Sequence, residues 1–441
     1  MKNKSYFKTS LSLFGWGMGA TCLAANPLQK LNVVLIMADD FGYENIRANG
    51  GEHPTPNIDR LAEEGIRFTN CHSNPLSTPS RVQLMTGKYN VKNYISFGQL
   101  DRTQTTFGHL FANAGYATCI TGKWQLGHDT DSPRHFGFQT SCLWQHTQKA
   151  VDKGGNDTRY ATPVVDIDGV IKEYPIGTFG PDIYNQFAID FIRKHKDEAF
   201  FLYYPMCLTH CPFVSTPDSE KWDQQRSPTY NGNAIYFPDM VAYTDKMVGN
   251  IVNELKRLNL MDNTMVIFIG DNGTDRKVMG KLNGKPYPGG KGYTIDSGTH
   301  VPMVVHFPNA TKGVNENLID FTDFLPSICD AAHISTKDMT ELDGKSFYNQ
   351  LTGKKAQPRE WIYCWYAPRN VWDEAACVFA RNKEYKLYRD GQFYHLTTDF
   401  YEKSPISIEN MSKEALKNYK MLSKVIERYE PYAKERKKVE R

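Results

Sequence analysis

The sequence predicts an α/β fold: a mainly parallel sheet sandwiched by helices, then a small C-terminal α+β subdomain with an antiparallel sheet. The first observation is a set of continuous apolar runs at 31–38, 199–204 and 265–269, typical of strands buried on both faces. The second is apolar residues at helical spacing between such runs, as in 239–258. The third is a change, after about residue 357, to short strands joined by tight turns.

The remaining elements follow from the same two periodicities and from glycine and proline signals. In chain order we expect a helix at 55–62, a strand from Ile66, a helix at 106–114 stopped by Gly115, strands at 116–121 and 303–308, a helix at 318–332 with Pro326 at a kink or a new start, C-terminal strands at 361–366, 376–380, 385–388 and 392–396, and a helix at 412–428.

The 441 residues suffice for one large domain and a smaller one. We place the main domain at 26–355 and the C-terminal subdomain at 356–441. Residues 1–25 carry three lysines, no acid and a weakly apolar run interrupted by glycines. This pattern predicts a secretory signal peptide, because the run is too short for a membrane span, and hence a periplasmic or secreted protein.

Lipidation at Cys22 is an alternative for this leader, but Gly19-Ala20-Thr21 matches a lipobox poorly. No other segment is long and apolar enough to span a bilayer. Loss of residues 1–25 cancels the formal charge of +3, so no basic excess favours nucleic acid or an anionic membrane. The other cysteines form no CxxC pair; Cys207 and Cys211 are close enough in sequence to pair, but nothing in the sequence shows that they do.

Two apolar strands end in neighbouring polar residues with oxygen ligands. Asp39-Asp40 follows the run at 31–38, and Asp271-Asn272 follows the run at 265–269. The carboxyl ends of parallel strands meet at one sheet edge, so these four side chains are expected to share one cation. An all-oxygen set favours a hard ion, Ca²⁺ or Mg²⁺, over zinc. The alternative is an aspartate pair that caps a turn.

A third polar cluster lies at 77–87, where Ser77-Thr78-Pro79-Ser80-Arg81 precedes a short apolar stretch and Gly87. Pro79 predicts that the chain around Ser77 is bent away from helix, and that a helix begins near Arg81 and stops at Gly87. A helix N-terminus beside a guanidinium is an anion site. The alternative is an ordinary Pro-Ser cap with a surface arginine.

The spacing Ser-x-Pro-Ser-Arg-x4-Thr-Gly resembles the signature of the type I sulfatases, of the alkaline-phosphatase-like superfamily, whose first residue is oxidised to formylglycine. The resemblance implies that Ser77 is so modified by a serine-type maturating enzyme. It also implies that Ser77 joins Asp39, Asp40, Asp271 and Asn272 around a metal, most often Ca²⁺ in this family. Arg81 would stabilise the nucleophile.

Residues 115–127 resemble a second sulfatase signature, Gly-Tyr-x-Thr-x3-Gly-Lys-Trp-His-Leu-Gly, except that Gln125 replaces the histidine. The resemblance implies that Lys123 holds the sulfate, although an isolated lysine is more often a solvated charge. Glutamine keeps the hydrogen-bonding capacity of the histidine but cannot act as a base. His128, three residues further on, is a candidate to contact the substrate in its place or to have a plain structural role.

Two more elements resemble the family. The motif His210-x-Pro after a strand implies a histidine that protonates the leaving oxygen, and Lys291-Gly implies a second sulfate-binding lysine. The Lys291 element departs from the family pattern at Ser297 and His300, which puts the local loop shape in doubt. Weak candidates for sugar contacts are Trp144, His146 and His300.

Together these elements imply a sulfatase that hydrolyses sulfate esters of sulfated carbohydrates. A phosphate or phosphonate ester hydrolase of the same fold is the alternative enzyme. A sulfated-glycan-binding protein that has lost catalysis is the alternative from another class, and Gln125 keeps it open. The sequence does not give the sugar, the ring position, or endo or exo action.

Overall fold

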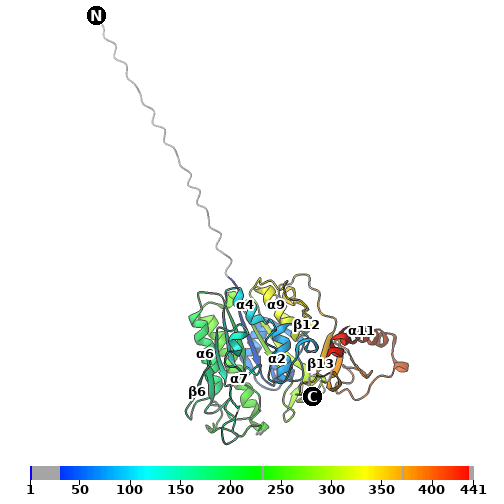
Figure 1. Cartoon of the computed structure of the whole chain (residues 1–441), viewed down its shortest axis with the longest axis horizontal. Coiled ribbons are helices and arrows are strands. Elements are labelled where there is room, and N and C mark those ends of the chain that lie inside the picture. The colour runs from blue at the N-terminus through cyan, green and yellow to red at the C-terminus, as the bar shows by residue number, and fades with distance from the viewer. Residues whose placement is uncertain (2–29, 150, 231–232, 370–371, 437–441) are drawn as a thin grey trace.

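A computed structural model of the chain describes residues 1, 30–149, 151–230, 233–369 and 372–436 (Figure 1). The predicted signal peptide and Cys22 lie outside the described residues. Within them, no helix is long and apolar enough to cross a membrane. The eight cysteines of this part are free thiols, so Cys207 and Cys211 are not bonded to each other.

The elements are the following. The strands are β1 (Asn32–Ala38), β2 (Ile66–His72), β3 (Ala117–Gly122), β4 (Thr140–Trp144), β5 (Val164–Ile167), β6 (Val170–Glu173), β7 (Phe200–Pro205), β8 (Thr264–Gly270), β9 (Met279–Leu282), β10 (Lys285–Pro288), β11 (His300–His306), β12 (Gly313–Asp320), β13 (Ile362–Tyr366), β14 (Cys377–Arg381), β15 (Tyr385–Tyr388) and β16 (Phe393–His395). The helices are α1 (Pro56–Glu64), α2 (Ser77–Thr86), α3 (Asn90–Asn93), α4 (Phe107–Asn113), α5 (Ser132–His135), α6 (Gly180–Lys194), α7 (Phe237–Arg257), α8 (Asp296–Thr299), α9 (Phe324–Ala331), α10 (Tyr348–Leu351) and α11 (Lys413–Glu435).

The main sheet has ten strands in the order β12-β2-β11-β8-β1-β7-β3-β4-β5-β6. Its centre is parallel: β8, β1, β7, β3 and β4 all run in one direction. Antiparallel pairs occur at β11, which lies between β2 and β8, and at β5 and β6 on one edge. The sheet is therefore mixed around a parallel centre, as the continuous apolar runs predicted.

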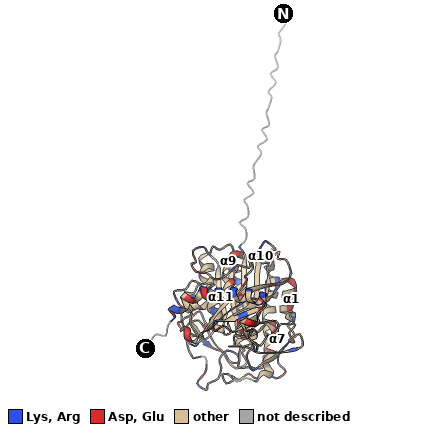
Figure 2. Ribbon diagram, turned by 90° about the vertical axis from the view of Figure 1, so that its right-hand side faces the viewer, with Lys and Arg blue, Asp and Glu red and all other residues tan. Residues whose placement is uncertain are grey.

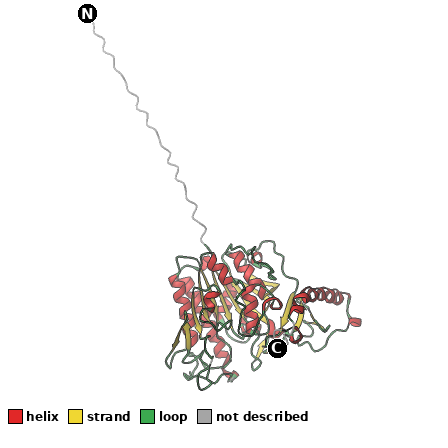
Figure 3. Cartoon of the chain, viewed as in Figure 1, coloured by secondary structure: helices red, strands yellow, loops and turns green. Residues whose placement is uncertain are grey.

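Helices cover both faces of this sheet (Figure 3). Alternate residues of a strand point to opposite faces, so Leu35 belongs to one apolar core and Ile36 to the other. The first core includes side chains of α2, α4 and α9, and the second includes side chains of α1, α6 and α7. Two buried cores on one sheet fix its register, because a one-residue slip would exchange them.

The structure corrects three details. Helix α2 begins at Ser77 rather than near Arg81, because a proline in the first turn, here Pro79, removes an N–H that has no helical partner. Residues 318–320 end strand β12, and α9 starts afresh at Phe324. No helix or strand was predicted from the sequence for 129–198, where the structure has α5, β4, β5, β6 and α6.

The C-terminal part is a four-stranded antiparallel sheet in the order β13-β14-β15-β16, with α11 packed beside it (Figures 1 and 3). This agrees with the predicted subdomain, although the boundary at residue 356 itself stays a prediction. Just before β13, buried Arg359 donates to Asp323 Oδ2 at 2.9 Å and to the Tyr89 hydroxyl at 2.8 Å. Arg359 thereby joins the start of α9 to the chain that enters the C-terminal sheet.

We expect Arg359→Met to destabilise the protein by about 3–5 kcal/mol, because it leaves the buried Asp323 carboxylate without its cation. The free energy of unfolding from urea denaturation measures this. Arg193→Met is the matched control, since Arg193 is half exposed and pairs with Asp190 and Glu254 at the surface. It should cost no more than about 1 kcal/mol. Equal losses for the two variants would contradict the assignment.

Candidate active site

The candidate site lies at the carboxyl ends of β1 and β8 and at the N-terminus of α2. The register pairs Ala38 with Gly270, so the residues after these two strands lie side by side. The backbone N–H of Asp40 donates to Asp271 Oδ1 at 2.9 Å, and Asn272 Nδ2 donates to Asp40 Oδ1 at 2.9 Å. The two polar pairs predicted from sequence thus meet at one point.

Ser77 lies at this point as well. Its hydroxyl oxygen is 3.1 Å from Asp39 Oδ1 and 3.1 Å from Asn272 Oδ1, so the one proton is donated to either of them. Asp39, Asp40 and Asp271 are fully buried and offer carboxylate oxygens within 4.8 Å of one another. All five predicted metal-site residues are therefore together.

The charges of this cluster fit a bound cation. Burial, reinforced by the nearby Asp39 charge, raises the pKa of Asp271 to about 7. Burial acts in the same direction on Asp39, but Lys123, His210 and Arg81 outweigh it and lower the pKa of that carboxyl. Burial therefore disfavours the ionised form of Asp271, and a bound cation would favour it. Because every donor is an oxygen, a hard divalent cation suits the set.

Three cations surround the carboxylates. Lys123 Nζ lies 2.6 Å from Asp39 Oδ2, and Lys291 Nζ lies 2.5 Å from Asp40 Oδ2. Burial lowers the pKa of the Lys123 ammonium, against the opposing effect of Asp39. One turn along α2 from the serine, Arg81 Nη2 lies 3.3 Å from Asp271 Oδ2, and its buried Nε has no hydrogen-bond partner among the described residues.

Unusual backbone conformations occur just before Lys123 and at Asp40 and Gln125. Gly122 has φ +113°, and a Cβ there would lie 2.1 Å from the carbonyl oxygen of Pro205, so only glycine lets β3 and β7 approach this closely before Lys123. Asp40 and Gln125 both adopt φ +55°, an uncommon conformation for residues other than glycine. The buried Gln125 Oε1 has no partner among the described residues.

The loop that carries Lys291 is held by the C-terminal sheet. Arg381 of β14 donates to Asp296 Oδ1 at 2.6 Å, and Lys386 of β15 donates to the carbonyl oxygen of Thr294 at 2.5 Å. Lys386 is buried and also pairs with Glu402 at 2.8 Å. The loop after Lys291 is therefore tied to residues almost a hundred positions later in the chain, while the backbone of Lys291 itself is bonded to Thr274.

His210 lies beside the cluster, with Nε2 3.8 Å from Asp40 Oδ2. Its Nδ1 is 2.8 Å from Arg159 Nη1 and 2.6 Å from the carbonyl oxygen of Cys211. Burial lowers the pKa of His210 well below its usual value, and the positive charges of Lys291 and Arg159 add to this. A bound anion beside the ring would oppose that shift.

Arg159 is a site residue that the sequence reasoning missed. Asp157 accepts hydrogen bonds from its Nε at 3.0 Å, and the indole ring of Trp144 lies 4.2 Å from its guanidinium carbon. These two contacts hold a buried cation against His210. The spacing Asp157-x-Arg159 was the only available signal, and it lies in the region to which the sequence assigned no element.

The comparisons with known proteins agree with this geometry. The family model described as Sulfatase matches residues 31–334, and the model described as N-sulphoglucosamine sulphohydrolase, C-terminal, matches residues 290–430. This chain belongs to the sulfatase family. It is therefore a sulfuric ester hydrolase with an alkaline-phosphatase-like fold, as the signatures at Ser77 and Lys123 implied.

Individual relatives cover most of this sulfatase. Human arylsulfatase A is 30% identical and aligns with 89% of this chain and 84% of its own length. An N-acetylgalactosamine-6-O-sulfatase of Bacteroides thetaiotaomicron is 27% identical over 76% of this chain and 79% of its own. A solved sulfatase structure from Pseudoalteromonas sp. has a TM-score of 0.72 at 20% identity, covering 93% of this chain and 92% of that one. This last similarity concerns the fold alone.

Two predicted substrate contacts of the sulfatase lie elsewhere. Both ring nitrogens of His300 are used, by Asp296 Oδ2 at 3.0 Å and by the carbonyl oxygen of Thr69 at 2.9 Å, and the ring stacks between Tyr43 and His72. The structure therefore places His300 at the junction with the C-terminal sheet.

His128 is exposed, and its Nδ1 lies 2.7 Å from the carbonyl oxygen of His146. The His146 ring lies near Asp166 and the carbonyl oxygen of Asp129. Within the described residues, neither histidine makes a hydrogen bond, ion pair or ring contact with the Ser77 cluster.

The variant Arg159→Gln tests the influence of the missed arginine. Glutamine keeps a donor near Nδ1 but removes a positive charge that disfavours the charged ring, so the pKa of His210 should rise. An NMR titration of the histidine ring signals measures this. Arg102→Gln, which removes the same charge from an exposed pair with Asp131, is the control and should leave His210 unchanged. An unchanged or lower pKa of His210 in Arg159→Gln would refute the electrostatic role.

Proposed function

We propose that this sulfatase hydrolyses sulfate esters of carbohydrates, with a formylglycine made from Ser77 and a Ca²⁺ ion held by the strand-end oxygens. The observation that carries the proposal is the position of Ser77 Oγ, 3.1 Å from both Asp39 Oδ1 and Asn272 Oδ1 at a helix N-terminus. Asp39, Asp40, Asp271 and Asn272 would hold the cation, with Mg²⁺ as the alternative ion.

Formylglycine, the metal ion and the surrounding side chains would each have a different role in the reaction. Formylglycine supplies a hydrated aldehyde as the nucleophile, and Ca²⁺ supplies the positive charge that polarises the sulfate. Lys123, beside Asp39, and Lys291, beside Asp40, neutralise sulfate oxygens as their charge shifts. Arg81 contributes its unpartnered Nε–H. His210 faces the same space through Nε2 and gives a proton to the leaving oxygen.

The carbohydrate class is supported by a relative whose name specifies an N-acetylgalactosamine sulfate. The phosphate or phosphonate ester hydrolase remains the rival reaction on this fold, and the pair of lysines with His210 favours sulfate over it. Gln125 cannot take the place of the signature histidine as a base, because an amide cannot accept a proton near neutral pH. His128 is turned toward His146, so it offers no evident replacement base.

Maturation and location complete the proposal. Because residue 77 is a serine, a serine-type maturating enzyme would make the formylglycine. The leader at 1–25 supports export, to the periplasm or out of the cell.

Mass spectrometry of the peptide containing Ser77, from protein made together with a serine-type maturating enzyme, should show loss of H₂ at that residue. Ser77→Ala should abolish sulfate release while the protein stays folded, because alanine has no hydroxymethyl group that can be oxidised to the aldehyde. Fully active protein that contains only unmodified serine at position 77 would refute the formylglycine mechanism.

Asp271→Asn should weaken Ca²⁺ binding by about tenfold or more, because it removes one of the three charges that hold the ion. Isothermal titration calorimetry with Ca²⁺ measures the affinity, and sulfate release should fall in parallel. Asp197→Asn makes the same change at an exposed position and is the control. Full activity of the native enzyme after verified removal of all metal would rule out the ion.

A further inference from the structure

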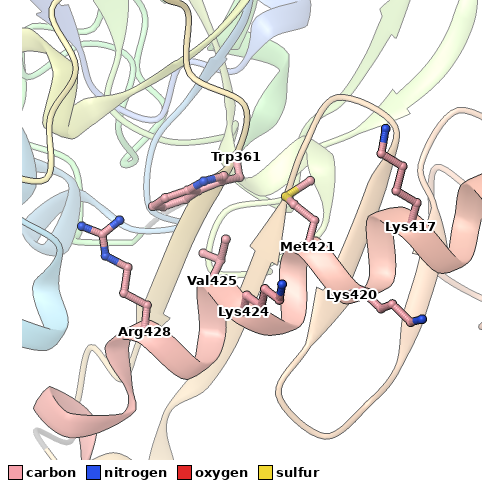
Figure 4. Close-up of a pocket in the computed structure, with 7 residues that line it drawn as sticks. All are labelled: Trp361, Lys417, Lys420, Met421, Lys424, Val425 and Arg428. Atoms are coloured by element: carbon pink, nitrogen blue, oxygen red, sulfur yellow. The ribbon is translucent and has the colours of Figure 1, made fainter.

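A groove of about 520 Å³ lies between α11 and Trp361, the residue just before β13 (Figure 4). Four basic side chains of α11 line it, and no acidic side chain does; they are Lys417, Lys420, Lys424 and Arg428. We call this surface the basic groove. Figure 2 looks onto the face of the molecule that carries α11.

The cations of the basic groove have no carboxylate partners among the described residues. Among the residues that the structure describes, no carboxylate oxygen lies within 4.0 Å of any of these four cations. Other exposed lysines do pair, such as Lys246 with Asp218 and Lys256 with Glu64. Like charges three and four residues apart on one helix face repel, so this arrangement opposes helix stability by itself. A bound anion would relieve the repulsion.

The floor of the groove is apolar. Met421 and Val425 extend from the helix toward the Trp361 ring, and the Arg428 guanidinium carbon lies 5.8 Å from the ring centroid (Figure 4). The indole offers a flat face for the C–H groups of a sugar ring. From Lys417 to Arg428 the helix rises about 17 Å, so the cations suit a ligand with repeated negative charges rather than one sulfate group.

The basic groove is distinct from the site around Ser77. Ser77 begins α2, whereas Tyr89, just after the other end of this helix, packs against Tyr429 with ring centroids 5.2 Å apart. Tyr429 follows Arg428 in α11. The length of α2, about 15 Å, therefore separates the two regions. A single small substrate does not reach both, but a polymer does.

We propose that the basic groove binds chains of sulfated polysaccharide and so retains polymeric substrate near the active site. The proposal rests on the carbohydrate class proposed above. When the groove holds one part of a polysaccharide, the other sulfate groups of that polysaccharide stay near the active site. Their effective concentration there is therefore higher. The concave shape of the basic groove favours an extended sugar polymer, because a flat membrane surface would contact only its rim.

Binding is measured first, in the inactive Ser77→Ala background. The groove variant combines Lys417→Ser, Lys420→Ser and Lys424→Ser. The control variant combines Lys153→Ser, Lys337→Ser and Lys355→Ser, which removes the same charge from exposed lysines outside the groove. Probes are a chondroitin sulfate polymer and its desulfated form. We expect the groove variant to bind the sulfated polymer roughly tenfold more weakly, and the control variant to bind normally.

A charge-conserving variant, with arginine at the same three groove positions, should restore binding and so separates loss of charge from loss of fold. With Ser77 intact, the groove variant should raise KM for the sulfated polymer and leave kcat unchanged. It should leave turnover of a small aryl sulfate unchanged. Absence of aryl sulfate turnover in every variant would count against the proposed catalysis, not against the groove.

Equal affinity of the groove and control variants for the sulfated polymer would overturn the proposal. Equal or tighter binding of duplex DNA or phosphatidylserine vesicles, lost in the groove variant, would also overturn it, because the site would then be specific for a different polyanion.

Discussion

The buried negative charge at the ends of β1 and β8 is the constraint on which the rest of the site depends. Three carboxylates with no exposed surface lie within 4.8 Å of one another, and such a group stays ionised only beside compensating cations. Lys123, Arg81 and Lys291 supply part of that charge from three other segments. The groups that stabilise the apoprotein are therefore the same ones that we propose to contact the sulfate.

Much of this arrangement follows from sequence because it depends on strand ends. The run before Asp39 and the run before Asp271 are apolar on both faces, which fixes parallel neighbours and brings their next residues together. The end of α2 at Gly87 was also predicted correctly. Gly87 has φ +67° and its N–H donates to the carbonyl oxygen of Gln83, which is a common helix ending. The antiparallel C-terminal sheet followed from its short strands and turns.

What sequence did not give depends on three-dimensional packing. Arg159 contacts the Trp144 ring and the His210 imidazole, and these two residues are far apart in the chain. The strands β4 to β6 show too little hydrophobic periodicity to be predicted, so their positions could not indicate these contacts. The start of α2 at Ser77 was missed because the local sequence does not distinguish a proline in the first turn of a helix from a proline that prevents a helix. His300 was a weak candidate for a sugar contact, at a position that departs from the family pattern, and its packing between Tyr43 and His72 favours a structural role.

The contacts that Arg381 and Lys386 make with residues 294–296 have a consequence for the order of folding. The loop of Lys291 is anchored by strands that are synthesised much later, so its long-range contacts must wait for nearly the whole chain. The parallel centre of the sheet, by contrast, needs nothing beyond β8. A nascent chain can therefore assemble the proposed metal ligands before the loop that follows Lys291 is anchored. The enzyme becomes complete only when its last sheet has docked.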